Sequence, residues 1–215
     1  MKYLPVRVAV VAASVATVAS AEQGPAAATL SRSTAECTVG QAHGSVVALL
    51  RTLPGSPEED KAAHRIAPIF NACGAELDIS RWSQGLYNGR AALAAAEVGR
   101  ELAKGRSAGS DGAVTPWYNA AIAGKAPGLG YDATSLGMQA FGTCVVGAAR
   151  DPSARLVASA AGSVEERAAI AAIKPVLAGC IAQGKPMHMT LDQLRLMVAE
   201  PLYHVITDGR SAGRS

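Results

Sequence analysis

Four cysteines are the residues of this chain whose spacing most directly implies chemistry. They form two pairs with the same separation of 36 positions: Cys37 and Cys73, then Cys144 and Cys180. Such thiols form disulfides, bind metals or carry redox chemistry. The sequence contains neither a C-x-x-C pair nor the C-x-x-C-H haem signature. Structural disulfides are therefore the favoured interpretation.

An internal repeat decides between the disulfide pairings. A shift of 107 positions places residues 37–73 on residues 144–180 without a gap, and 13 of the 37 aligned positions are identical. This indicates a duplicated unit. Four cysteines allow three pairings, and duplication favours Cys37–Cys73 with Cys144–Cys180, one bridge in each unit. In the chain-entropy model each bridge contributes about 4 kcal/mol.

Both copies of the repeat also carry the pattern Gly-Ser-x-Glu-Glu. Neighbouring carboxylates such as Glu58 and Glu59 are candidates for general acid–base catalysis. The same pattern starts a helix, because Ser56 and Ser163 are good N-caps and a glutamate follows each of them by three residues. Capping explains the whole spacing, so we predict no catalytic role for these glutamates.

Metal and cofactor chemistry has weaker support. Met187, His188 and Met189 offer the soft ligands that suit copper. The corresponding segment of the first unit, residues 77–79, has Leu-Asp-Ile instead, which favours two buried methionines. The four histidines show no ligand spacing, and no phosphate-binding loop or G-x-S-x-G elbow is present. We therefore predict no catalytic residue, no metal and no cofactor.

Large aromatic residues are the remaining candidates for a site. Only 4% of the chain is aromatic. Trp82, Tyr87, Trp117 and Tyr118 are candidates for a ligand or partner surface, because aromatic side chains anchor interfaces and line pockets. Packing in the core or between the repeats is the alternative. Glu97 and Glu101, by contrast, have the spacing of a solvated helix face with neighbouring basic residues.

The elements that must position these residues are helices. Alanine is abundant, and β-branched and aromatic residues are sparse, so helix is favoured throughout. We predict an all-α fold of two duplicated units, each with about four helices and one intra-unit disulfide. The expected helices are 29–41, 45–53, 57–73 and 80–102 in the first unit, and 136–148, 151–160, 164–180 and 190–205 in the second. Pro68 and Pro175 should kink or split their helices.

The N-terminus determines the expected compartment. Lys2 and Arg7 precede a short apolar run, and the small residues at 19–21 form a cleavage pattern, so residues 1–21 are predicted to be a signal peptide. The other predicted segments are a first unit at 22–103, a Gly/Ser-rich linker with a short helix at 104–131, a second unit at 132–207 and a disordered tail at 208–215. We expect a periplasmic or secreted protein that does not span the membrane after cleavage.

Charge gives no support for nucleic acid as a partner. Cleavage removes two of the 20 basic residues and none of the 17 acidic ones, which leaves a net charge of +1. A nearly neutral chain is not typical of proteins that bind nucleic acid or anionic lipid through a basic surface.

Several short motifs resemble a known group of proteins. They are Phe-Gly-Thr-Cys-Val-Val at 141–146, Gly-Ser-x-Glu-Glu at 162–166, the segment 175–180 and Ala-Glu-Pro-Leu-Tyr at 199–203. Together they are similar to small exported alphaproteobacterial helical proteins of unassigned function. The resemblance implies an exported helical module and no particular chemistry. Pro201 departs from the pattern of that group and questions the end of the last helix.

Two functions follow as hypotheses. The first is an exported module without catalytic activity that binds a protein or an envelope component. The alternative is a small periplasmic enzyme or ligand carrier with a site between the two repeats. The duplicated scaffold motivates the first hypothesis. The aromatic residues and the linker between the repeats motivate the second.

Overall fold

The computed structural model describes residues 31–74, 82–126, 130–181 and 189–208, and of residues 82–88 it describes only the backbone. All regular secondary structure in these ranges is helical. The helices are α1 (Arg32–Leu50), α2 (Pro57–Ala72), α3 (Trp82–Ala103), α4 (Asn119–Ile122), α5 (Ala133–Ala148), α6 (Arg150–Ala158), α7 (Val164–Cys180) and α8 (Leu191–Asp208). The all-α prediction is confirmed for the described chain.

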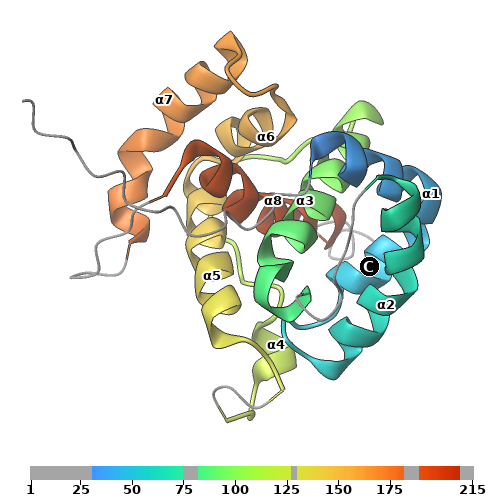
Figure 1. Cartoon of the computed structure of the whole chain (residues 1–215). Helices are drawn as coiled ribbons and strands as arrows, with labels where there is room; N and C mark the ends of the chain where they lie inside the picture. The colour runs from blue at the N-terminus through green and yellow to red at the C-terminus, as the bar shows by residue number, and fades with distance from the viewer. Residues whose placement is uncertain (1–30, 75–81, 127–129, 182–188, 209–215) are drawn as a thin grey trace, which may run out of the picture.

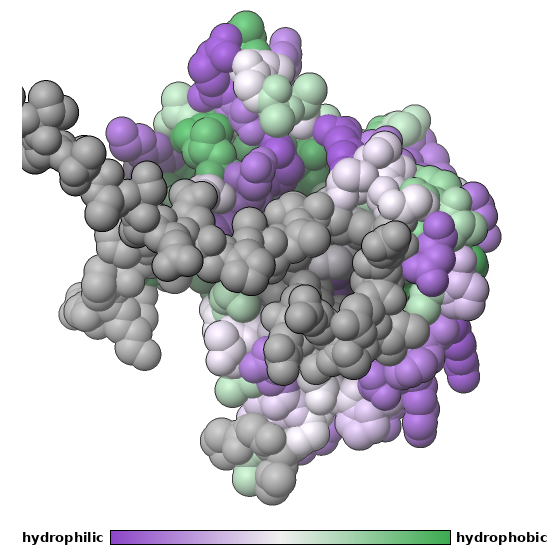
Figure 2. Space-filling view, viewed as in Figure 1, coloured by the Kyte–Doolittle hydropathy of each residue, from purple (hydrophilic) through white to green (hydrophobic). Residues whose placement is uncertain are grey.

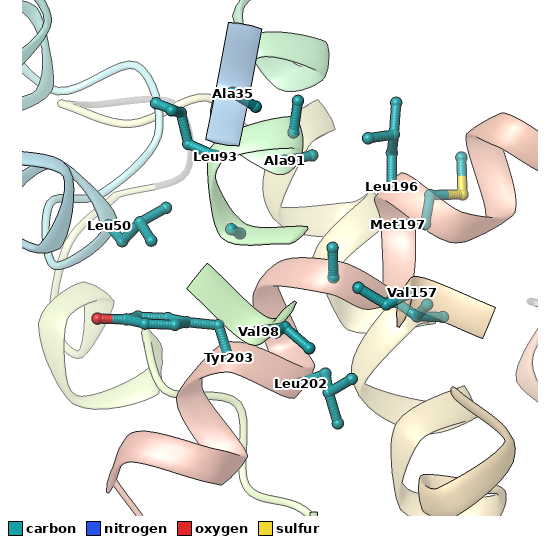
Figure 3. Packing of buried hydrophobic residues seen from close by; sticks show 14 of the residues in the cluster. Ala35, Leu50, Ala91, Leu93, Val98, Val157, Leu196, Met197, Leu202 and Tyr203 are labelled. Carbon is teal, nitrogen blue, oxygen red and sulfur yellow. The ribbon is translucent and has the colours of Figure 1, made fainter. Parts of the chain in front are cut away.

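Helices α3 and α8 lie at the centre and pack against each other (Figure 1). Helix α1 covers α3 and carries α2 on its outer side, whereas α5 and α6 cover α8 and carry α7. One continuous apolar cluster runs from Ala35 to Ile206 and includes residues of both predicted units. In Figure 3, Tyr203 of α8 lies below Leu50 of α1, and Leu202 of α8 lies below Val157 of α6.

Two disulfides lie in the outer layers of the fold. Cys37–Cys73 joins α1 to the end of α2, and Cys144–Cys180 joins α5 to the end of α7. The Cα–Cα distances, 5.8 and 5.6 Å, are usual for disulfides. The predicted pairing is thus confirmed. Such bridges are typical of oxidising compartments.

Both predicted capping boxes are present. The Ser56 Oγ accepts a hydrogen bond from the Glu59 amide at 3.2 Å, and the Ser163 Oγ accepts one from the Glu166 amide at 3.0 Å. Each glutamate also accepts a hydrogen bond from the amide of the glycine that precedes the serine. These bonds satisfy amides that a helix N-terminus leaves without partners.

Helix α1 contains a break at Ala42, where φ is −132° and ψ is 31°, so that two helical segments meet there. The prediction places two helices over this region, at 29–41 and 45–53, and the break falls between them. At Ala149, 107 positions later, φ is −148° and ψ is 60°, and there the chain divides into α5 and α6. The helices are thus interrupted at corresponding positions of the two aligned segments.

Prolines do not split the helices that contain them. Pro68 lies within α2, Pro175 within α7 and Pro201 within α8, and α8 continues to Asp208. Proline lacks an N–H, so Pro201 cannot donate to the Met197 carbonyl four residues earlier. A Cβ at Gly142 of α5 would lie 1.9 Å from that carbonyl oxygen. Glycine therefore lets α5 approach α8 at the turn that Pro201 modifies.

Hydrophilic residues dominate the visible surface around α2 (Figure 2), where Asp60, Lys61 and His64 are exposed. None of the described helices is long and apolar enough to cross a membrane. The predicted signal peptide, the Met187–His188 pair and residues 209–215 of the predicted tail lie outside the described residues.

The Gly142 contact predicts the effect of one added methyl group. Gly142→Ala should lower the free energy of unfolding by about 3 kcal/mol, because the new Cβ meets a main-chain oxygen that cannot move without displacing α8. Chemical denaturation followed by circular dichroism measures this change. Gly137→Ala on the same helix meets no atom within 4 Å and should be neutral or slightly stabilising. Equal effects of the two variants would contradict the interpretation.

Candidate functional site

A cavity of about 500 Å³ lies between residues 107–117, which precede α4, and the helices α5, α6 and α8. This volume is within the usual range of small-molecule sites. The side chains that line it include Trp117, Thr143, Arg150, Pro201, His204 and Asp208. We call it the Trp117 cavity. The Trp117 ring stacks on the His204 ring, with centroids 4.3 Å apart.

Arg90, which is 1% exposed, holds together the groups behind the cavity wall. Its guanidinium binds the Glu200 carboxylate through Nε and Nη2, and the Glu59 carboxylate through Nη1 at 2.9 Å. It also donates to the carbonyl oxygens of Leu49, Leu50 and Thr52. The helix α1 ends here, and Arg90 adds donors to carbonyl oxygens that have no partner within the helix; Leu49 also accepts from Thr52. A cation at this position also interacts favourably with the helix dipole.

A second chain of hydrogen bonds connects Arg90 with the cavity wall. The buried Gln139 side chain donates from Nε2 to Glu200 Oε2 at 2.8 Å. Its Oε1 accepts a hydrogen bond from Trp117 Nε1, also at 2.8 Å. Gln139 thus has a single amide orientation that satisfies both partners. Through Gln139, the carboxylate of Glu200 that binds Arg90 also orients the indole of Trp117.

His204 is held as an imidazolium by its two acceptors. Its Nδ1 lies 2.9 Å from Asp208 Oδ2, and its Nε2 lies 3.2 Å from the Leu50 carbonyl oxygen. Both partners accept only, so both ring nitrogens must donate. Burial acts to lower the pKa of His204, but the hydrogen bond with Asp208 and the nearby Glu200 carboxylate, 3.9 Å from Nε2, outweigh it and raise the pKa above 6.5.

The two carboxylates that share Arg90 differ in acidity. Burial acts to raise the pKa of Glu200, but the charge of Arg90, its hydrogen bonds and the nearby His204 outweigh it and lower the pKa. For Glu59, burial is the larger effect and raises the pKa despite the nearby guanidinium. Glu200 takes the bidentate contact with Arg90, which explains why the cation stabilises its charge more.

The four predicted aromatic residues have different environments. Trp117 lines the cavity. Tyr118 is buried in a small cluster with Leu53 and Leu136, and its hydroxyl donates to the Leu136 carbonyl oxygen. The side chains of Trp82 and Tyr87 lie outside the described residues. Of the two described side chains, Trp117 lines the cavity and Tyr118 does not; for Trp82 and Tyr87 the prediction stays untested.

The predicted solvated face of α3 is wrong. Glu97 is 0% exposed and Glu101 is 4% exposed. Glu97 Oε1 lies 2.7 Å from His43 Nδ1, and Lys104 and Arg106 lie near the Glu101 carboxylate. Burial, and to a smaller degree the Glu97 charge, raises the pKa of Tyr203 to about 12. Basic neighbours allow these carboxylates to lie beneath α1 and α8.

Sequence patterns did not identify the central residues of the site. Arg90 and Gln139 belong to no motif, and Glu200 lies in the Ala-Glu-Pro-Leu-Tyr segment, to which no role was assigned; 110 positions separate Arg90 from Glu200. The one available signal is that Arg90 directly precedes the apolar run Ala-Ala-Leu-Ala-Ala-Ala. A lone cation next to a buried stripe indicates a buried ion pair, but it does not identify the partner.

Removal of the buried cation should have a large effect on stability. Arg90→Met leaves Glu200 and Glu59 buried without it, so the free energy of unfolding should fall by about 3–5 kcal/mol. Arg155→Met, which breaks the exposed pair with Asp151, should cost at most about 1 kcal/mol. Urea denaturation at neutral pH measures both. Similar losses for the two variants would show that the Arg90 cluster does not support the fold.

The protonation of His204 should make stability depend on pH. Its pKa in the folded chain is above 6.5, so its contribution is complete below about pH 6.5 and is lost as the pH rises through the folded-state value. Denaturation midpoints measured at several pH values should show this loss, and His204→Gln should remove it. His64→Gln, at an exposed position, should behave like the unmodified protein. An unchanged pH profile in His204→Gln would contradict the assignment.

Comparisons with known proteins do not assign the chain to a family. No protein-family model matches it, and no curated protein and no solved structure is significantly similar to it. The function must therefore be argued from the Trp117 cavity and from the buried groups that hold its wall.

Proposed function

We propose that this protein is an exported binding protein without catalytic activity, and that the Trp117 cavity is the site for a small ligand. The observation that carries the proposal is a cavity of about 500 Å³ whose aromatic wall is fixed by buried hydrogen bonds. A wall that is rigid before binding loses little conformational entropy on binding, which favours affinity.

Two buried groups at the wall, His204 and Glu200, are poorly placed to act as general bases. A general base needs a free lone pair within reach of the substrate. Both nitrogens of His204 donate hydrogen bonds to neighbouring acceptors. Glu200 is bound by Arg90 and Gln139 beneath the wall. These two groups, whose pKa values are shifted, therefore hold the fold and the wall together.

The position of the cavity favours the ligand-carrier hypothesis. Its lining residues come from the connecting segment 104–131, from the second unit at 132–207 and from Asp208, which directly follows that unit. The first unit contacts residues of the wall, because Arg90 binds Glu200 and the Leu50 carbonyl oxygen binds His204. The other hypothesis, a module that binds a protein or an envelope component, stays a prediction.

Duplication of one helical unit is part of the proposal, and corresponding contacts support it. Glu59 binds Arg90, and Glu166 binds Arg195. The same two arginines donate to the carbonyl oxygens of Leu49 and Leu156, respectively. These acceptors are 107 positions apart, as are the cysteines, whereas the two arginines are 105 positions apart and are not aligned by the repeat. Arg90 also binds an acidic residue of the other unit, Glu200.

A defined ligand screen tests the binding function. The melting temperature of the unmodified protein should be measured in the presence of each of five compound classes. These are amino acids with short peptides, organic acids, sugars, nucleosides and neutral aromatics. At least one class should raise the melting temperature, because a ligand that binds the folded chain stabilises it. Ala113→Trp, at an exposed position on the cavity lining, should abolish the increase.

Ala120→Trp is the matched control, because Ala120 is also exposed but does not line the cavity. This variant should respond like the unmodified protein. If no class stabilises the protein, the Trp117 cavity is not a small-ligand site. A response that persists in Ala113→Trp would place the ligand elsewhere.

A further inference from the structure

Arg150 brings a cation without an acidic partner to the Trp117 cavity. It is the first residue of α6, and its Nη2 donates to the Gly112 carbonyl oxygen at 3.1 Å. No carboxylate of the described residues lies within ion-pair distance of its guanidinium, and Nε is buried without a hydrogen-bond partner among them. Nη1 also makes no hydrogen bond to the described part of the chain. A guanidinium with free donors suits a carboxylate or phosphate.

Asp208 brings the opposite charge to the same cavity. Its side chain is 56% exposed, so solvent or a ligand reaches the carboxylate. Oδ2 binds His204, and Oδ1 accepts a hydrogen bond from Thr207 at 3.3 Å. A carboxylate offers about four acceptor positions, so two contacts leave capacity for an ammonium group. The cavity thus presents one accessible cation and one accessible anion.

Main-chain groups along the cavity offer a third kind of contact. Ala113, Val114 and Thr115 line it and belong to no helix. Their amides and carbonyls form no hydrogen bond within the described ranges. The neighbouring Gly112 is held by hydrogen bonds to Gly147 and Arg150, which anchors the start of this segment. An extended peptide pairs with exposed main-chain groups of this kind.

From these three observations we infer that the Trp117 cavity binds short peptides with free termini. The C-terminal carboxylate binds Arg150, the N-terminal ammonium binds Asp208, and the peptide main chain pairs with residues 113–115. This inference rests on the proposed ligand-binding function and names its ligand class. Small apolar side chains fit best, because Pro201, Val205 and Ile206 form the apolar part of the lining.

The volume of the cavity limits the peptide length. A volume of about 500 Å³ corresponds to roughly 17 water molecules at about 30 Å³ each. A tripeptide of small residues has a similar number of non-hydrogen atoms, so trialanine is a suitable probe. A phosphate ester satisfies Arg150 but leaves Asp208 facing a like charge, which disfavours that class.

Calorimetric titration of trialanine, its C-terminal amide and its N-acetyl form tests the inference. Trialanine should bind, and each blocked peptide should bind at least about tenfold more weakly, as expected for a lost charge-assisted contact. Arg150→Gln should weaken trialanine binding by a similar factor without weakening the amide further. Asp208→Asn should do the same with respect to the N-acetyl peptide.

Arg155→Gln is the control, because Arg155 lies on the same helix and pairs with Asp151 at the surface. It should bind all three peptides like the unmodified protein. Equal binding of trialanine and its amide would overturn the inference, as would a loss in Arg150→Gln that affects both peptides alike. If trialanine does not bind but another class stabilises the protein through the cavity, only the peptide inference fails. If no class binds, the proposed function fails with it.

Discussion

The Arg90 charge is the interaction on which most of the structure depends. A buried guanidinium is stable only when nearly all its donors have acceptors and its charge is balanced. Here those acceptors come from the end of α1, the start of α2 and the middle of α8. The helices must therefore meet at this point, and a shift of one of them would leave a buried charge without a partner. Apolar packing alone would tolerate such shifts more easily.

The same charge network determines the character of the Trp117 cavity. Glu200 binds Arg90 on one side and Gln139 on the other, and Gln139 orients the indole of Trp117. His204 binds the Leu50 carbonyl oxygen that also accepts from Arg90. The cavity wall is thus an extension of the core, whereas Arg150 and Asp208 at the cavity keep unused hydrogen-bonding capacity. This division separates the groups that hold the fold from those available to a ligand.

Local patterns in the sequence were sufficient for the parts of the structure that depend on local geometry. Equal cysteine spacing and an aligned repeat predicted both disulfides, and Ser56 with Glu59 predicted a helix start. The burial of Glu97 could not be predicted, because its spacing from Arg100 is equally typical of a solvated helix face. The Trp117 cavity could also not be predicted from the sequence, which indicated only Trp117 as a candidate. Its walls join residues from segments far apart in the chain, and no pattern within one segment indicates such a contact.

The placement of the disulfides has a consequence for how the fold comes apart. Each bridge fastens an outer helix to its own side of the molecule, and neither crosses the α3–α8 contact. Helix α7 packs mainly on α6 and α5, and its Glu166 binds Arg195 of α8. Helix α2 packs on α1, and its Glu59 binds Arg90 of α3. Without its disulfide, each outer helix is therefore held by the neighbouring helices of its own side and by one ion pair with a central helix, so reduction should lower the free energy of local opening in both outer layers.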